Sequence, residues 1–477
     1  MLRVPEERFP RTDPAALAGF LAFCRDEARR DGKPRIGSIS LEVRHIDPLA
    51  VLQSIYEPGE LHFYLEKPAA GEAVAGAEAL ESATFAGTER FARVRAWADE
   101  ALTRVIAIGD LGTPRAGPQF FAGFAFADEA GEAAAFAPAT VFLPRWQVAA
   151  SGGRYVAVAN VRVTPEADPA ALAARVLAAH AKFSAFPYEV TAFPGEGEAV
   201  SAEEPFSVTE TGGEGWFEAA VADALGRIRA GVYRKVVLAR AFDLVRKTPF
   251  APLETLHRLR EHFPACHGFS LANGRGQSFI GVTPERLARV EGRALQTEAL
   301  AGSAPRGRTA PEDARLGRAL LGHDKDLREH RVVVESIVRR LQGLGLEPAV
   351  AESPRLLALS NVQHLWSPVS AKLPAGMHLL EVVAALHPTP AVGGQPREAA
   401  RADIARLERF DRGLYAGAVG WFDHAGDGEF VVAIRSALMD GARARLYAGA
   451  GIVEGSDPAE EKAETDLKLK ALLDTLR

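Results

Sequence analysis

Cysteine is scarce in this chain of 477 residues, and long apolar runs and an excess of positive charge are missing. Its two cysteines, Cys24 and Cys266, cannot build a disulfide framework, and each is expected to be a small buried hydrophobe. No stretch approaches the roughly 20 apolar residues of a transmembrane helix, and the first residues do not form a signal peptide. A net charge of −6 gives no basic footprint for nucleic acid. We therefore expect a cytoplasmic protein with no membrane or nucleic-acid partner.

The signatures of several common enzyme classes are also missing. The sequence has no P-loop, no HExxH metal site, no GxSxG nucleophile elbow and no complete GxGxxG. What it does have is the composition of a globular protein, 47% hydrophobic and 25% charged. At this length either one large α/β unit or two subdomains are possible.

Composition divides the chain into two parts. Residues 194–215 are rich in Gly, Pro and Glu, which is typical of a linker. We predict an N-terminal scaffold over residues 1–200, with a β-meander at 120–163, and a catalytic region over residues 214–477. The two parts are expected to form one intertwined unit. The first part contains capped helices and short strands but no cluster of reactive side chains, so packing is its expected role.

The stretch 447–468 predicts a strand end, a glycine turn at 449–451 and a helix with a clear start. Asp457 occupies the N-cap and Pro458 the first helical position. One face of this helix carries, at helical spacing, Glu461, Glu464, Thr465 and Lys468. A solvated face with i,i+4 ion pairs is one interpretation. The other is a site in which carboxylates hold a hard cation beside backbone N–H groups that bind an anion.

Two further residues have polar side chains where the pattern is otherwise apolar. Glu329 heads the stripe of Val333 and Ile337 on a helix predicted from residue 324 to 341, so its carboxylate is placed to face inward. Arg435 interrupts the apolar run 430–434 of a predicted strand. A carboxylate is the natural partner of an arginine in such a place.

Lys235 and Glu285 allow two interpretations each. Lys235 opens a predicted strand, and a lysine there is usually a solvated edge residue. Glu285 lies on the irregular Thr283-Pro284 approach to the second strand of a predicted hairpin, where an exposed turn carboxylate would be ordinary. The second interpretation of each residue comes only from the resemblance to a known family given below.

Seven segments, in this order along the chain, resemble the chorismate-utilising enzymes, a family that includes isochorismate synthase, anthranilate synthase component I, aminodeoxychorismate synthase and salicylate synthase. The resemblance runs from about Trp216 to the C-terminus. It implies an α/β (α+β) fold with large antiparallel sheets in a sandwich-like core flanked by helices, chorismate as substrate, and Mg²⁺ as cofactor. The segments are KVVLAR (235–240), TPERL (283–287), TEALAGSAPRG (297–307), REHRVVVESI (328–337), LHPTPAVGG (386–394), AIRSAL (433–438) and the stretch 447–468.

The resemblance also implies roles for individual residues. Glu329 and Glu464 would hold Mg²⁺, with Glu461 nearby. Lys235 would be the general base and Glu285 the general acid, on opposite faces of the chorismate ring. Arg435 and Lys468 would bind the substrate carboxylates. The other implied substrate-binding residues are Ala301, Gly302, His364, Thr389, Ala391, Gly449, Ala450 and Gly451.

Differences within the family favour one member. Aminodeoxychorismate synthases have a nucleophilic lysine at the position of Ala301, and pyruvate-eliminating members commonly have Thr at that of Ala391. No glutaminase is fused to the chain, so no glutaminase partner is expected, and the LLES tetrapeptide of tryptophan-inhibited relatives is absent. We therefore predict an isochorismate synthase, an isomerase. Salicylate synthase and an inactive chorismate-binding subunit are the alternatives, and the pathway served (menaquinone, siderophore or salicylate) stays open.

Overall fold

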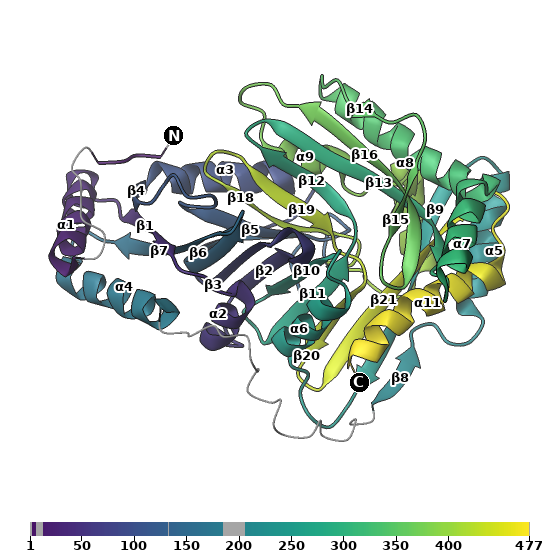
Figure 1. Cartoon of the computed structure of the whole chain (residues 1–477), viewed down its shortest axis with the longest axis horizontal. Helices are drawn as coiled ribbons and strands as arrows, with labels where there is room; N and C mark the ends of the chain where they lie inside the picture. The colour runs from purple at the N-terminus through teal and green to yellow at the C-terminus, as the bar shows by residue number, and fades with distance from the viewer. Residues whose placement is uncertain (1, 6–12, 132, 185–205, 477) are drawn as a thin grey trace.

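The computed structural model describes residues 2–5, 13–131, 133–184 and 206–476. Strand pairing links 21 strands of these ranges into one hydrogen-bonded network, and helices cover its faces and both ends (Figure 1). Every pairing between described strands is antiparallel except that of β1 with β4. The predicted fold class, large antiparallel sheets flanked by helices, is confirmed.

The N-terminal elements form a twisted antiparallel layer with α1 and α4 packed together at the far end (Figure 1). Asp13 caps α1 by accepting a hydrogen bond from the N–H of Ala15, as its sequence predicts. The predicted meander is present as β5, β6 and β7. The elements are α1 Pro14–Asp31, β1 Arg35–Val43, α2 Pro48–Ile55, β2 His62–Lys67, η1 Pro68–Ala70, β3 Glu72–Phe85, α3 Arg90–Thr103, β4 Val105–Gly109, β5 Gln119–Phe124, β6 Ala139–Ser151, β7 Arg154–Val163 and α4 Pro169–Ser184.

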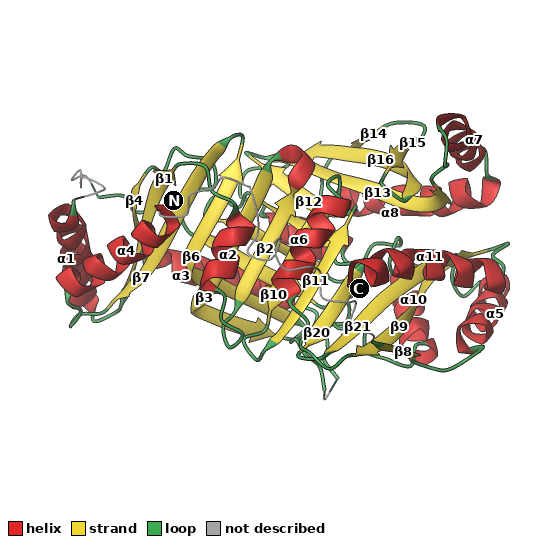
Figure 2. Cartoon of the chain, turned by 60° about the horizontal axis from the view of Figure 1, so that its bottom comes forward, coloured by secondary structure: helices red, strands yellow, loops and turns green. Residues whose placement is uncertain are grey.

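The remaining elements carry all seven motif segments, and two layers of them face each other. In Figure 2 β13, β16 and α8 form one layer, and β9, β21 and α11 form the other. The elements are β8 Ser207–Glu210, α5 Trp216–Arg229, β9 Lys235–Val245, α6 Pro252–His262, β10 His267–Ala272, β11 Gln277–Thr283, β12 Arg286–Glu291, β13 Ala294–Pro305, α7 Ala310–Leu321, α8 Asp324–Gly343, β14 Ala349–Val350, β15 Arg355–Ala358, β16 Val362–Lys372, α9 Leu379–Leu386, β17 Gly394–Gln395, α10 Arg397–Leu407, β18 Ala418–Asp423, β19 Gly428–Val432, β20 Ser436–Asp440, β21 Arg443–Val453 and α11 Pro458–Leu476.

Two strand pairs join the parts of the chain that lie before and after residue 206. β5 pairs with β18, so that Phe121 lies opposite Trp421, and β2 pairs with β10. Aromatic side chains continue the contact, with the rings of Phe120 and Phe422 stacked 5.3 Å apart. The predicted boundary between the two parts is thus crossed by main-chain hydrogen bonds.

Three local predictions are wrong, and a fourth is right only in part. The predicted linker contains β8, which pairs with β9, while residues 194–205 of it lie outside the described ranges. The predicted hairpin, with its turn near Glu291-Gly292, is present as β12 with β13, but its first strand does not extend back over residues 278–283, which belong to β11 and pair with β10 and β20. Residues 449–451 are not a turn but extended residues of β21, paired with β9. Arg435 is not inside a strand but in the bend between β19 and β20, with φ +49°.

The predicted helix cap at Asp457 and the predicted burial of both cysteines are confirmed. Asp457 caps α11 by accepting hydrogen bonds from the N–H groups of Ala459 and Glu460. Cys24 and Cys266 are buried free thiols. No helix in the described part of the chain is both long and apolar enough to cross a bilayer.

A buried ion pair connects three segments of the C-terminal part. Arg412 binds both oxygens of Glu408, at 2.8 and 2.5 Å, and the two side chains are 3% and 2% exposed. The same guanidinium donates to the carbonyl oxygens of Val392 and Val237, and Glu408 accepts from the N–H of Ala239. The pair therefore holds β9 against the loop that follows α9.

Replacement of Arg412 by Ala should destabilise the fold severely. The substitution leaves the Glu408 carboxylate and two carbonyl groups buried without their partner, which typically costs about 3–5 kcal/mol. The midpoint of chemical denaturation should fall accordingly. Lys462→Ala, which removes the exposed ion pair with Glu218, should change the midpoint little, and an equal loss in the two variants would contradict the assigned role.

Candidate active site

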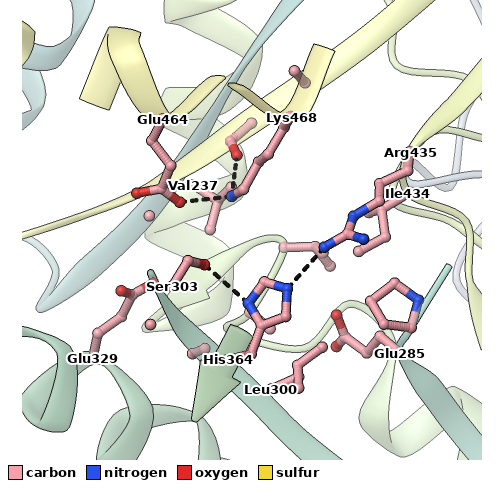
Figure 3. Close-up of a pocket in the computed structure, with 18 of the residues that line it drawn as sticks. Val237, Glu285, Leu300, Ser303, Glu329, His364, Ile434, Arg435, Glu464 and Lys468 are labelled. Atoms are coloured by element: carbon pink, nitrogen blue, oxygen red, sulfur yellow. Dashed lines mark hydrogen bonds and ion pairs between the residues drawn. The ribbon is translucent and has the colours of Figure 1, made fainter. Parts of the chain in front are cut away.

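A pocket opens between the two layers that carry α8 and α11. It is lined by eleven of the predicted site residues, which come from five different elements and three of the segments between elements (Figure 3). Segments separated by up to 183 residues, from Glu285 to Lys468, thus meet at one place. The eleven residues are Glu285, Ala301, Gly302, Glu329, His364, Ala391, Arg435, Gly449, Gly451, Glu464 and Lys468.

The other four predicted site residues, Lys235, Thr389, Ala450 and Glu461, do not line this pocket. Lys235 lies directly behind its wall, because its Nζ is 2.9 Å from Oε1 of Glu329, which does line it. The contact is an ion pair whose angle falls outside hydrogen-bond geometry. Lys235 is fully buried, so its interpretation as a solvated edge residue is wrong. Glu285 is only 3% exposed, so its interpretation as an exposed turn carboxylate is wrong as well.

Carboxylates and lysines alternate along one side of the pocket. Besides Lys235 with Glu329, Lys468 binds Glu464 at 2.7 Å, and Lys325 binds Glu461 at 2.6 Å. The solvated-face interpretation of α11 fails, since Glu461 and Thr465 are 1% and 0% exposed. Burial opposes ionisation of Glu464, but Lys468, Lys325 and Lys235 bring the pKa of its carboxyl below the ordinary value.

The fit of this side to Mg²⁺ can be judged from its donors. Carboxylate oxygens are the ligands of a hard cation, and Glu329 and Glu464 supply them from two helices that face the same pocket. Burial and the neighbouring Glu464 raise the pKa of Glu461, as expected where carboxylates crowd. Among the described residues, no three His, Cys, Asp or Glu side chains converge closely enough to hold a metal ion. The carboxylate oxygens of Glu329 and Glu464 are thus the type of ligand that fits Mg²⁺, and two such side chains face the pocket.

Glycines of β21 allow this close approach of charged groups. A Cβ atom on Gly451 would lie 2.1 Å from Oε1 of Glu329 and 3.1 Å from Cε of Lys235. A Cβ atom on Gly449 would lie 2.7 Å from the hydroxyl of Tyr415. The glycines thus make room at the floor of the pocket rather than forming the predicted turn.

Glu285 lies at the other end of the pocket in the view of Figure 3, on the same side as Arg435. Its backbone occupies the two-residue break between β11 and β12. Burial raises the pKa of the Glu285 carboxyl to about 8, and Glu298 acts in the same direction, while Lys235, the Thr389 hydroxyl and Lys468 oppose the shift. At neutral pH the carboxyl is therefore mainly protonated and able to donate a proton.

Arg435 pairs with a histidine and not with the carboxylate that the sequence predicts, so that prediction is wrong. Its Nη2 lies 2.8 Å from Nε2 of His364, whose Nδ1 lies 3.0 Å from the hydroxyl of Ser303 (Figure 3). Burial lowers the pKa of His364 most, and the positive charges of Arg435 and Lys468 lower it further, so that this pKa lies well below its usual range. The ring is thus neutral, and since Arg435 only donates, Nε2 accepts and Nδ1 carries the hydrogen. Nη1 of Arg435 is buried without a partner among the described groups, so it is free to bind a ligand.

The sequence did not point to several residues that complete the pocket. Ser303 and Tyr415 are polar, and Ser303 was recognisable only as the residue after Ala301-Gly302 in a motif. Lys325, which binds Glu461, shares one turn of helix with Glu329 and could have been found by that spacing. The apolar lining residues include Val237, Leu300, Val392 and Ile434.

Comparison with known proteins gives a consistent result. The family model described as "Chorismate binding enzyme" matches residues 22–477. A "Salicylate biosynthesis isochorismate synthase" of Pseudomonas aeruginosa is 36% identical over 468 residues, which cover 97% of this chain and 94% of that protein. The isochorismate synthase MenF of Bacillus subtilis is 38% identical over 261 residues, 55% of each chain.

A solved structure is similar over almost the whole chain. It is that of MenF, the menaquinone-specific isochorismate synthase from Escherichia coli, with a TM-score of 0.76 and 28% identity. The superposition covers 96% of this chain and 100% of that one. The N-terminal part, which the motifs did not cover, is therefore included in the likeness.

The titration of Glu285 should make the free energy of unfolding depend on pH. Its folded pKa is raised, so its contribution is complete below the unfolded value near 4.5 and is lost as pH rises through about 8. The denaturation midpoint of Glu285→Gln should therefore rise relative to that of the wild type from about pH 5 to about pH 8, and the difference should stay constant at higher pH. A constant difference across this range would show that Glu285 titrates normally.

Proposed function

The chain belongs to the chorismate-binding enzyme family, and on this premise we propose that it is an isochorismate synthase. The enzyme is an isomerase: water adds at C2 of chorismate and the hydroxyl at C4 leaves. One observation carries the proposal most directly. A buried lysine, Lys235, lies directly behind one wall of the pocket, and a buried carboxyl with a raised pKa, Glu285, lines the pocket at its other end. A base and an acid in separate positions are what this exchange of hydroxyl groups requires.

Cationic side chains account for the binding of a dianion. Arg435 has an unpaired buried Nη1 facing the pocket region, and His364 holds the guanidinium in place through Nη2. Lys468 lies at the same pocket, between the carbonyl oxygen of Gly449 at 2.9 Å and Glu464. These groups would bind the carboxylates of chorismate and orient its ring between Lys235 and Glu285.

Proton movements follow from the two environments. Lys235, in its neutral form, would take a proton from the attacking water, and Glu285 would give its proton to the departing C4 hydroxyl. The second step needs Glu285 protonated at working pH, which its raised pKa provides. Ala301 leaves no nucleophile for a covalent route at that position.

Mg²⁺ is the proposed cofactor, and Glu329 and Glu464 are the residues that would hold it, with Glu461 nearby. When bound, the ion would neutralise negative charge where a substrate carboxylate sits. Mg²⁺ commonly takes one or two protein carboxylates and fills its other positions with water and substrate, so the two pocket carboxylates support the proposal.

Product analysis is the experiment that tests the function. The purified protein, incubated with chorismate and Mg²⁺, should establish a mixture of chorismate and isochorismate that chromatography resolves. Salicylate and pyruvate as the main products would instead identify a salicylate synthase. Binding without conversion would identify an inactive chorismate-binding protein.

Loss of either the base or the acid should slow turnover without abolishing binding. Lys235→Ala and Glu285→Gln should each lower kcat by about 10²–10⁴-fold, the usual contribution of a positioned acid or base. Chorismate should still bind, because Arg435 and Lys468 remain. The matched controls are Arg234→Ala and Glu291→Gln, whose side chains are 64% and 74% exposed. Near-normal kcat in either active-site variant would refute the assigned roles.

The metal assignment makes a prediction about binding. Mg²⁺ together with chorismate should raise the thermal unfolding temperature of the wild type, because a ligand of the folded state stabilises it. Glu464→Gln should lose most of the Mg²⁺-dependent part of this increase. Glu460→Gln, an exposed neighbour on the same helix, should keep it. An unchanged response of the Glu464 variant would remove Glu464 from the metal site.

A further inference from the structure

The break between β11 and β12 is closed by side chains where main-chain pairing stops. β12 pairs with β13 only from Arg289 to Glu291, and its pairing with β19 shifts register between Arg286 and Ala288. Beyond this point, Thr297 donates to the carbonyl oxygen of Leu287 at 2.7 Å. Glu298 accepts from the N–H of Arg286 at 2.8 Å. The N–H of the peptide group that follows Glu285 is therefore bound by a side-chain carboxylate rather than by a main-chain carbonyl.

Both oxygens of that carboxylate are in use. Oε1 accepts from Arg286 N–H, and Oε2 accepts from Nε1 of Trp366 at 2.7 Å. Two N–H donors, one on each oxygen, hold the Glu298 carboxylate in one orientation. A neutral acceptor would serve Arg286 N–H equally well, so the negative charge is more than the closure of the break requires.

Other hydrogen bonds fix the remaining backbone of the break. Glu285 N–H donates to Oγ1 of Thr283 at 3.2 Å, and the carbonyl oxygen of Glu285 accepts from Val432 N–H at 3.0 Å. Together with the bond from Glu298, these contacts leave the backbone of residue 285 little freedom. Glu298 is thus held at one place relative to the backbone of Glu285.

We propose that Glu298 is a positioning residue for the reaction, whose carboxylate holds the bend that carries Glu285 and places a negative charge near it. This inference rests on the proposed function, in which Glu285 must be protonated when it acts. A nearby negative charge disfavours ionisation of a second carboxyl group. The raised pKa of Glu285, to which Glu298 contributes after burial, agrees with this arrangement.

Other charged groups around Glu285 act against Glu298. Lys235 of β9 and Lys468 of α11 both favour the ionised form of Glu285, as does the hydroxyl of Thr389 in the loop after α9. His364 of β16 is neutral. Arg435 and the carboxylates of Glu329 and Glu464 line the same pocket. Glu298 of β13 therefore offsets two lysines that would otherwise tend to deprotonate the acid.

Charge and hydrogen bonding at residue 298 can be separated by substitution. Glu298→Gln removes the charge and keeps an acceptor, and Glu298→Ser is a second variant without the charge. Glu298→Asp keeps the charge. Trp366→Phe removes one hydrogen bond to Glu298 but leaves its charge, so this variant controls for a purely structural effect. Thermal unfolding would verify that each variant is folded.

The protonation of Glu285 can be measured directly from the infrared C=O stretch of its neutral carboxyl, identified by its absence in Glu285→Gln. In Glu298→Gln and Glu298→Ser the band should disappear at lower pH than in the wild type, by about one pH unit. The alkaline limb of the kcat profile should move by the same amount, because the acid is lost earlier. Glu298→Asp and Trp366→Phe should keep most of the wild-type midpoint.

Two results would overturn the proposal: an unchanged midpoint in both charge-free variants, or a shift in Trp366→Phe as large as that in Glu298→Gln. The infrared titration does not require turnover. A protein that fails to convert chorismate would therefore refute the proposed function while still reporting on Glu298.

Discussion

The pocket depends on the buried ion pair of Glu408 and Arg412. Removing a guanidinium and a carboxylate from water costs free energy. The pair is tolerated here because Arg412 and Glu408 bind each other and also hydrogen-bond to main-chain groups around them. The guanidinium also lies over the ring of Phe126, 4.2 Å from its centroid, so the N-terminal part packs on the same group. Strand β9, which begins with Lys235, and the loop that contains Ala391 are thus held at a fixed distance from each other.

Charge balance explains why the site is stable before any ligand enters. Each carboxylate on its α8–α11 side has a lysine partner, and Lys235, the proposed base, forms one of these pairs with Glu329, a proposed metal ligand. A buried carboxylate without such a partner would take up a proton. Glu285 is the exception, since Glu298 opposes the lysines near it, and it is the group that the proposed mechanism requires in the protonated form.

Much of the architecture could be read from the sequence, and the failures have physical causes. The cap at Asp457 and the stripe of Val333 and Ile337 act within one helix, so spacing was sufficient. The sequence of residues 449–451 predicts a turn because glycine is common in turns, whereas in the structure glycine allows close packing against Glu329. Pairing of β11 with β10 and β20, and of Arg435 with His364, joins segments far apart in the chain, which local patterns do not reveal.

The pairing of β5 with β18 has a consequence for synthesis of the chain. Phe124 at the end of β5 and Ala418 at the start of β18 are partners, yet 294 positions separate them. At about 5–20 residues per second, a ribosome needs roughly 15–60 s to produce the second strand after the first. During that time one edge of a strand that is fully buried in the folded protein, with Phe120 and Phe121, has no neighbour to cover it. The nascent N-terminal part is therefore a natural client for chaperones that bind exposed strands.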